Sequence, residues 1–182
     1  MQNALGLLEI VSIPKGVESG DAMLKAASVE LIEAHPVCAG KYIIVITGEV
    51  AAVKESLAAG KEVCGMKLVD SLIIPKVDPQ VPRAIAMCND FGEVQAVGSI
   101  ETFSVCSCVL AADVAVKAAE VRLIEVRLAR GLGGKGFIMM TGEVAAVESA
   151  IKAAQALDEV QGLMSESVVI AAPHPGIVRS LV

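Results

Sequence analysis

Short apolar runs and helically spaced apolar residues alternate along this chain. Residues 4–12 (ALGLLEIVS) and 96–105 (AVGSIETFSV) are nearly continuous apolar runs of strand length. Each run is followed by a stretch in which apolar residues recur every three or four positions, at residues 17–28 and from Ala112 to Ala119. A strand-length run followed by helical spacing predicts a strand and then a helix. The chain carries this pair twice.

The same pattern predicts a hairpin and a second helix after each pair. Thr47 is expected to cap a helix whose first turn holds Glu49, because its hydroxyl can accept a backbone hydrogen bond there. The order strand, helix, hairpin, helix, strand predicts the α+β class, with helices packed on an antiparallel sheet. The remaining predicted strands are residues 29–33, 42–46 and 68–75, with residues 167–171 as the counterpart of the last.

The sequence is a tandem duplication. The heptapeptide TGEVAAV stands at residues 47–53 and again at residues 141–147. Sliding the chain by 92 places aligns residues 4–33 with residues 96–125, and 13 of these 30 pairs are identical. Internal repetition of this extent predicts two domains of one fold, each near the lower end of the usual size range.

One loop separates the two copies. It reads HPVCAGK at residues 35–41 and RLARGLGGK at residues 127–135, and beyond it the offset becomes 94. When two repeats keep the same scaffold and differ in one loop, that loop is typically where their functions differ. We predict a first domain at residues 1–90 and a second at residues 91–182, joined near residues 88–95.

Composition indicates extensive subunit interfaces. The hydrophobic fraction is 54% with only 2% aromatic residues, and the mean hydropathy is +0.66. Two small cores do not readily hide that much apolar surface, so the surplus predicts large contacts between subunits. A membrane is not expected to take it up, because the longest apolar stretches are far shorter than the roughly 20 residues of a spanning helix.

The net charge, the cysteine content and the N-terminal sequence limit the cellular compartment and the classes of binding partner that we expect. A net charge of -6, a pI near 5.0 and few aromatic rings argue against nucleic acid as a partner. The N-terminal MQNALGLLEI has neither a basic region nor a cleavage-like site, so no secretory signal is expected. Five cysteines without a regular framework fit a reducing compartment. We therefore expect a cytoplasmic protein.

Side chains suited to catalysis are sparse. The two histidines, His35 and His174, lie far apart in their repeats, and the motifs HExxH, CxxC and GxSxG do not occur. The loop at residues 131–135 (GLGGK) departs from a phosphate-binding P-loop, because position 129 is alanine and position 136 is glycine. Acidic residues that recur in both copies, Asp21/Asp113 and Glu9/Glu101, are assigned to the shared scaffold.

Cys38 is the cysteine that stands apart. It lies in the diverged loop, whereas Cys64, Cys88, Cys106 and Cys108 read as small buried or half-buried residues of helices and of the linker. A single loop thiol cannot form a metal site unless symmetry brings several copies together.

The order of these motifs resembles the domain of bacterial microcompartment shell proteins. The resemblance rests on DAMLKAA and on GK before TGEVAAV, and it covers residues 4 to about 86 and 96 to about 178. Two unpermuted domains in one chain resemble the tandem subclass. That subclass implies a homotrimer shaped as a pseudohexamer, in which the loop between the second and third strands faces a central pore.

Within that subclass the chain is most similar to the T-type shell proteins of propanediol-utilisation microcompartments. In those proteins a loop cysteine from each of three chains holds one [4Fe-4S] cluster, and Cys38 stands at the matching place. Their loop reads Cys-Pro-Gly-Lys, whereas this one reads Cys38-Ala39-Gly40-Lys41. The missing proline loosens the turn but removes no ligand.

The resemblance implies two sets of functional residues besides the metal ligand Cys38. Lys25 and Lys117 match the lysine at the tile edge, where neighbouring tiles meet. The residues implied to line the pore are Val37, Ala39, Gly40 and Lys41 in the first loop and Arg130, Gly131, Leu132, Gly133 and Gly134 in the second.

Three functions follow as hypotheses. The first is a structural shell tile, not an enzyme, whose pore carries a [4Fe-4S] cluster for electron transfer or redox sensing. The second is a shell tile whose pore passes a metabolite and holds no cluster. The third is a cytosolic ferredoxin-like enzyme or ligand sensor. The first implies contact with other shell proteins and with a redox enzyme, and no nucleic acid or membrane partner.

Overall fold

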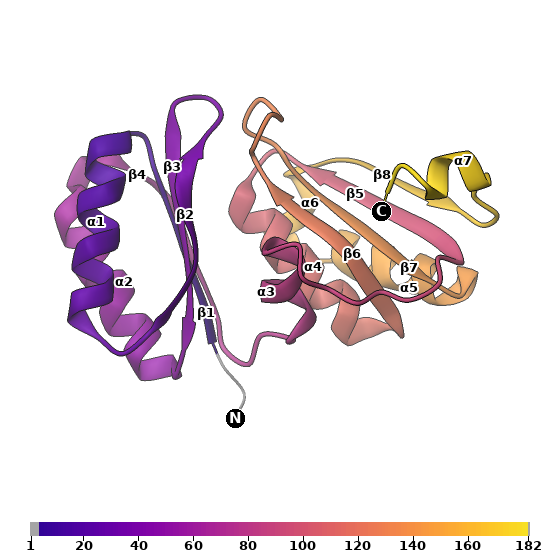
Figure 1. Cartoon of the computed structure of the whole chain (residues 1–182), viewed down its shortest axis with the longest axis horizontal. Helices are drawn as coiled ribbons and strands as arrows, with labels where there is room; N and C mark the ends of the chain where they lie inside the picture. The colour runs from indigo at the N-terminus through magenta and orange to yellow at the C-terminus, as the bar shows by residue number, and fades with distance from the viewer. Residues whose placement is uncertain (1–3, 182) are drawn as a thin grey trace. The chain divides into compact units, whose positions relative to one another are not determined.

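Each half of the chain folds as a four-stranded antiparallel sheet with helices packed on it. The computed structural model describes residues 4–181 and divides into two compact units (Figure 1). The first unit comprises the residues up to Val77 together with Ala129–Gly134, and the second comprises Asp78–Leu128 and the residues from Lys135 onward. The predicted α+β class and the tandem repetition of one fold are confirmed.

The first sheet has the strand order β2-β3-β1-β4, and all neighbouring strands are antiparallel. Helices α1 and α2 contact each other and pack on the sheet (Figure 1). The elements of this unit are β1 (Ala4–Ile10), α1 (Ile13–Ala26), β2 (Glu30–Val37), β3 (Lys41–Gly48), α2 (Val50–Cys64), the short 3-10 helix η1 (Gly65–Lys67) and β4 (Leu68–Ile74).

The second sheet repeats this order as β6-β7-β5-β8, again antiparallel throughout. The elements of the second unit are α3 (Gln80–Ile85), β5 (Ala96–Thr102), α4 (Val105–Ala118), β6 (Val121–Leu128), β7 (Gly136–Gly142), α5 (Val144–Gln155), α6 (Asp158–Gln161), β8 (Met164–Ile170) and α7 (Pro175–Val178). The repeated order follows from the repeated alternation of apolar runs and helical spacing.

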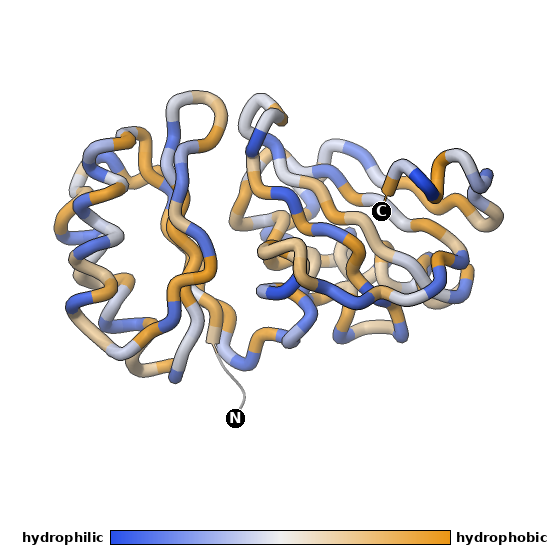
Figure 2. The backbone as a smooth tube through the Cα atoms, viewed as in Figure 1, coloured by the Kyte–Doolittle hydropathy of each residue, from blue (hydrophilic) through white to orange (hydrophobic). Residues whose placement is uncertain are grey.

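The core of the first unit lies between the sheet and its helices. Leu8 and Ile44 from the strands meet Met23 from α1 and Leu57 from α2, and all four are at most 1% exposed. Figure 2 shows the hydrophobic colour concentrated along the central strands. Truncating a side chain buried to this extent to alanine costs about 2 to 5 kcal/mol, so this cluster contributes much of the stability of the unit.

One glycine in each repeat sets the distance between helix and sheet. A Cβ atom on Gly6 of β1 would lie 2.7 Å from Val53 Cγ1 of α2, and one on Gly98 of β5 would lie 2.5 Å from Val147 Cγ1 of α5. Real Cβ atoms do not approach neighbours so closely, so any other residue would push the helix away. The identity of these two positions in the repeat therefore has a packing cause.

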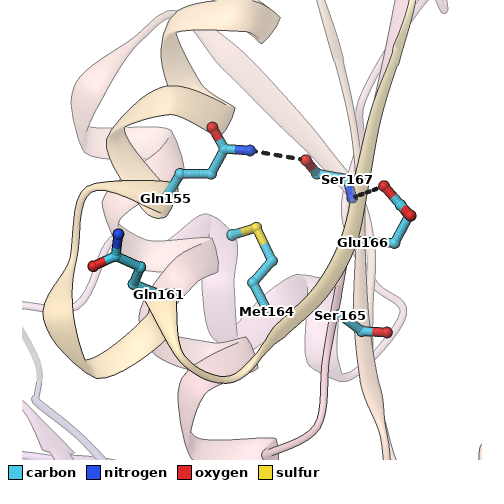
Figure 3. A pocket seen from close by; sticks show the side chains of 6 residues that line it. All are labelled: Gln155, Gln161, Met164, Ser165, Glu166 and Ser167. Carbon is cyan, nitrogen blue, oxygen red and sulfur yellow. Dashed lines mark hydrogen bonds between the residues drawn. The ribbon is translucent and has the colours of Figure 1, made fainter.

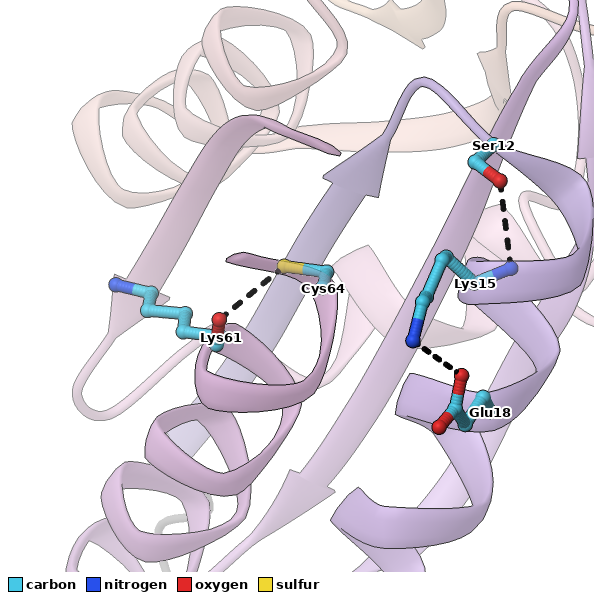
Figure 4. A network of polar contacts seen from close by, with 5 residues as sticks. All are labelled: Ser12, Lys15, Glu18, Lys61 and Cys64. Carbon is cyan, nitrogen blue, oxygen red and sulfur yellow. Dashed lines mark hydrogen bonds and ion pairs between the residues drawn. The ribbon is translucent and has the colours of Figure 1, made fainter. Parts of the chain in front are cut away.

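The first helix begins earlier than predicted. Its start is fixed by Ser12, whose Oγ accepts a hydrogen bond from the Lys15 backbone N–H at 3.4 Å (Figure 4). In the next turn, Lys15 Nζ and Glu18 Oε2 form an ion pair at 2.7 Å.

At the end of α2, the thiol of Cys64 donates to the carbonyl of Lys61 at 3.5 Å, as Figure 4 also shows.

Thr47 is not the helix cap that its sequence position predicts. It belongs to β3, and its hydroxyl donates to the carbonyl oxygen of Ala4 at 2.9 Å. Thr141 makes the same bond to Ala96 at 2.9 Å in the second unit. Strand β3 continues to Gly48, so the Thr47 hydroxyl bonds the neighbouring strand and not the start of α2. Glu49 is the N-cap residue of α2, and its side chain makes no capping hydrogen bond.

Candidate functional site

The turn between β2 and β3 places Cys38 at the tip of a hairpin. Val37 ends β2 and is 7% exposed, whereas Cys38 is half-buried and Ala39 is exposed. Gly40 has a φ of 73°, and a Cβ there would meet no atom within 4 Å. The peptide bond between Cys38 and Ala39 is cis. The Cys38 residue thus adjoins a stretch of backbone that is open at Gly40.

The turn between β6 and β7 is longer and rich in left-handed backbone. Gly131, Gly133 and Gly134 have φ values of 75°, 62° and 97°, a region that favours glycine. Ala129 adopts a φ of 56° as well. Arg130 is exposed, and a Cβ on Gly131 or Gly133 would meet no atom within 4 Å. This turn presents backbone and a single cationic side chain to solvent.

Residues 129–134 group with the first unit, next to the Cys38 turn. The backbone N–H of Cys38 donates to the carbonyl oxygen of Ala129 at 3.2 Å. A Cβ built on Gly134 would lie 3.7 Å from the Cys38 carbonyl oxygen and 3.8 Å from Lys41 Nζ. The structure thus gathers Cys38, Lys41 and the Gly-rich turn, which the sequence analysis had assigned to one pore lining.

A glutamate–lysine ion pair stands at the base of each turn. Glu9 Oε1 lies 2.5 Å from Lys41 Nζ, and the Glu9 side chain is only 3% exposed. This contact is ionic, because Glu9 Oε1 makes no well-directed hydrogen bond. In the second unit Glu101 Oε1 accepts a hydrogen bond from Lys135 Nζ at 2.8 Å. Hydrogen bonds from Lys135 and then from Ser165 lower the pKa of Glu101.

A second pair, of a basic and an acidic side chain, precedes each turn, and sequence reasoning missed it. His35 Nε2 lies 2.8 Å from Glu33 Oε2 on β2. At the equivalent place on β6, Arg127 Nε lies 2.5 Å from Glu125 Oε1, and its guanidinium lies over the Phe137 ring at 5.1 Å. The signal was present, because the offset of 92 aligns both Glu33 with Glu125 and His35 with Arg127.

The other cysteines differ from Cys38 in their surroundings. Cys64, Cys106 and Cys108 are buried, as predicted. Burial raises the pKa of the Cys64 thiol, and complete burial raises that of Cys108 to about 12. The prediction for Cys88 is wrong: this residue is exposed in the linker after α3, and its thiol donates to the Ala86 carbonyl at 3.2 Å.

The predicted edge lysines occupy equivalent last turns, on α1 and α4. Lys25 Nζ contacts Asp21 Oδ2 at 2.6 Å, and Lys117 Nζ contacts Asp113 Oδ2 at 2.6 Å. The first pair is exposed, whereas the Asp113 side chain is only 5% exposed. The repeated aspartates therefore hold the lysines, and Asp113 also has a structural role inside the second unit.

The second unit also carries a shallow polar hollow between α5, α6 and β8 (Figure 3). Gln155 Nε2 donates to Ser167 Oγ at 3.0 Å, and the Ser167 backbone N–H donates to Glu166 Oε1 at 3.2 Å. Gln155 and Ser167 are thus joined across the open surface of this hollow. The remaining lining residues are Gln161, Met164 and Ser165.

Within residues 4–181, no three His, Cys, Asp or Glu side chains converge on a position that could hold a metal ion. Cys38 is thus one thiol per chain, and a cluster there would need ligands from several chains. Over the same residues, no helix combines the length and apolar character needed to span a membrane.

Comparison with known proteins gives matches over both halves of the chain. The BMC domain matches residues 4–77 and 96–173. The chain is 42% identical over 182 residues to the bacterial microcompartment shell protein PduT of Citrobacter freundii, an alignment that covers 100% of this chain and 99% of that protein. A carboxysome shell protein of Thermosynechococcus vestitus is 39% identical over 62 residues, which cover 34% of this chain and 55% of that protein.

A solved structure agrees over nearly the full length. The crystal structure of a microcompartment protein from Desulfitobacterium hafniense superposes with a TM-score of 0.94 at 46% sequence identity. The superposition covers 98% of this chain and 99% of that one.

Proposed function

The chain belongs to the BMC domain family and is a structural shell protein of a bacterial microcompartment; on this basis we propose that three copies form a ring whose central turns hold a [4Fe-4S] cluster. The predictions of a shell location and of a structural protein instead of an enzyme are confirmed by the family. The observation that carries the cluster proposal is Cys38, a half-buried thiol at the tip of a hairpin turn.

The trimer follows from the duplication and from symmetry. Two domains in one chain make half of a ring of four or one third of a ring of six, and closed rings are the usual outcome of head-to-tail contacts. The sixfold shape of family tiles favours three chains. A threefold axis near the turns would bring three Cys38 thiols together.

The residues at the turn fit a shared cluster. Thiolates are the usual ligands of iron–sulfur clusters, and three of them leave one iron of a cube for a small exogenous ligand. Cys38 is held in place by the bond from its own N–H to Ala129, while Ala39 and Gly40 leave open space beside it. A bound cluster would supply one-electron transfer or redox sensing across the shell, with a redox enzyme as its partner.

A pore without a cluster is the second candidate, favoured by the Gly-rich turn. Its open backbone and the exposed Arg130 would suit the passage of a small anionic metabolite. In that case Cys38 would be a free thiol of the pore lining. At the perimeter, Lys25 and Lys117 would pack along the edges of neighbouring shell proteins in either case.

Anaerobic purification of the full chain tests the cluster. We expect visible iron–sulfur absorbance, and iron and sulfide corresponding to one cluster per three chains. Cys38→Ser should give a colourless protein of unchanged oligomeric mass, whereas Cys88→Ser, at the other cysteine that is not buried, should keep its iron. Iron retained in Cys38→Ser at the wild-type ratio would disprove the assignment. A wild-type trimer that stays colourless after reconstitution with iron and sulfide would favour the metabolite pore.

A further inference from the structure

Helix α3 covers the outer edge of the second sheet. It lies against β6 and α4 in the second unit. The Gln80 side chain bonds two backbone groups of edge strand β6: its Nε2 donates to the Val121 carbonyl at 3.2 Å, and its Oε1 accepts from the Leu123 N–H at 3.0 Å. Asn89 Nδ2 donates to the Leu123 carbonyl at 3.0 Å. The segment thus takes the place of a further strand.

The start of this segment is held by a buried carboxylate. The Asp78 backbone N–H donates to Asp113 Oδ1 of α4 at 2.8 Å, while Asp113 Oδ2 accepts from Lys117. From α3 itself, Val81 is 0% exposed and Ile85 is 3% exposed. Polar anchoring and apolar burial together dock α3 in the second unit.

The C-terminal segment is a copy of this docking segment. Strand register fixes the alignment, because Leu5 pairs with Ile74 and its counterpart Val97 pairs with Ile170, which gives an offset of 96. The local bonds repeat as well: Asp78 Oδ1 accepts from the Gln80 N–H at 2.9 Å, and His174 Nδ1 accepts from the Gly176 N–H at 3.0 Å. The offset matches Asp78 to His174, Pro79 to Pro175, Val81 to Ile177 and Arg83 to Arg179.

The copy is exposed where the original is buried. Ile177 is 51% exposed, against 0% for Val81, and no residue of α7 is buried. The matching receiving surface on the first unit is open in the same way. Leu31 of β2 is 42% exposed where Leu123 is 0% exposed, and the Asp21 side chain is 60% exposed where that of Asp113 is 5% exposed.

We infer that residues 174–181 of one chain dock on β2 and α1 of a second copy of this chain, as α3 docks on β6 and α4. Ile177 packs on Leu31 of the neighbouring copy, and the His174 backbone N–H donates to Asp21 Oδ1 of that copy. This inference rests on the trimer proposed above and names the contact that closes it. Gly176 stands where Gln80 stands in α3, so the side-chain clamp on the strand edge is absent and Ile177 carries more of the contact.

The contact is head-to-tail, so each chain gives one segment and receives one. In the full chain, Ile177→Asp disrupts the docking segment, and Leu31→Asp disrupts the surface on β2 that receives it. We expect either change to raise the dissociation constant of the trimer about 100-fold or more, because an unpaired charge would enter an apolar contact. Sedimentation velocity over a range of concentrations measures this.

Mixing the two variants gives a sharper test. The intact tail of Leu31→Asp can dock on the intact edge of Ile177→Asp, but the complementary contact cannot form. The mixture should therefore yield dimers of about twice the 18.7 kDa of one chain, with no closed trimer. Neither variant alone should do so.

Met66→Asp is the matched control. Met66 is 100% exposed, and a Cβ on its counterpart Gly162 would meet no atom within 4 Å, so this position is open in both units. The Met66→Asp variant should therefore remain trimeric. Circular dichroism should show Ile177→Asp folded, since α7 has no buried residue. Wild-type trimer stability in both interface variants would overturn this inference and leave the trimer proposal standing, whereas a monomeric wild type would overturn both.

Discussion

Glu9 and Lys41 form an ion pair that is nearly sealed from water, at 2.5 Å and with Glu9 3% exposed. Their counterparts Glu101 and Lys135 lie 2.8 Å apart, with both side chains more than one third exposed. The same two residue types at the same fold position therefore have different electrostatic surroundings, and the Coulomb interaction weakens as water approaches.

The two pairs should respond differently to loss of the acid. Glu9→Gln leaves Lys41 charged at a largely buried place, so we expect a loss of about 2 to 4 kcal/mol in unfolding free energy. Glu101→Gln should cost no more than about 1 kcal/mol, because exposed pairs contribute little. Urea denaturation at neutral pH compares them. Equal losses would show that the burial of Glu9 has no energetic consequence.

Acid should remove a contribution of Glu101. Its pKa is lowered from the ordinary value of 4.5 by Lys135 and Ser165, so its stabilising effect is complete above that value and is lost as the pH falls through the folded-state pKa. Between about pH 5 and pH 3, Glu101→Gln should therefore lose stability less steeply than the wild type. Melting temperatures over this range test it, and parallel curves would contradict it.

Loss of the two predicted edge lysines should affect the fold unequally. Lys25→Ala removes an exposed pair and should change the unfolding free energy by about 0.5 kcal/mol or less. Lys117→Ala leaves the buried Asp113 carboxylate with only the Asp78 N–H, and we expect a loss of about 2 to 3 kcal/mol. Thermal unfolding at neutral pH separates the two, and a reversed order would contradict the assignment of Asp113.

Tile assembly follows as a separate prediction. Lys25→Ala spares the fold of the single chain, and sedimentation velocity should first establish that the variant is trimeric, because Lys25 pairs with Asp21 at the inferred docking surface. Trimers of this variant should form two-dimensional sheets less readily than wild type in negative-stain electron microscopy, since the lysine stem no longer packs along the seam. Lys54→Ala, at an exposed position of α2, serves as a control for loss of one charge. Sheets of undiminished extent would remove Lys25 from the edge.

Native cysteine labelling should follow burial. Cys88 is exposed and should react first with a small alkylating agent, followed by Cys38 when no cluster protects it. Cys108 has a pKa of about 12 and is completely buried, so it should react only after unfolding. Mass spectrometry of peptides from timed samples gives the order. Early labelling of Cys108 would indicate opening of α4.

Much of the fold was accessible from the sequence, because the apolar pattern is strong and stated twice. What was missed were the ends of the elements. Ser12 and its counterpart Ser104 cap α1 and α4, yet both were assigned to the preceding strands, since an apolar run does not show where side-chain capping begins. Thr47 was assigned as a cap because the sequence alone does not show that its hydroxyl is bound by Ala4 on another strand.

The candidate site, like the fold, could be predicted from the sequence only in part. The position of Cys38 on a hairpin turn was predictable from the diverged loop. The docking of α3 was not, because Gln80 bonds residues more than 40 positions away and no local pattern encodes such a contact. Exposure differences between repeats, as at Leu31 and Leu123, are also invisible to sequence comparison, since the residues are identical.

The difference between the two hairpin turns determines what stoichiometry a ring of these domains can support. In a ring of six identical domains every turn would carry a thiol, and six ligands exceed the four corners of an iron–sulfur cube. Duplication followed by divergence leaves Cys38 in one turn of each chain and a Gly-rich backbone in the other, so the proposed ring of three chains would carry three thiols. With threefold in place of sixfold symmetry, such a ring would offer three thiolates to one iron–sulfur cube and would leave its fourth corner for a small ligand.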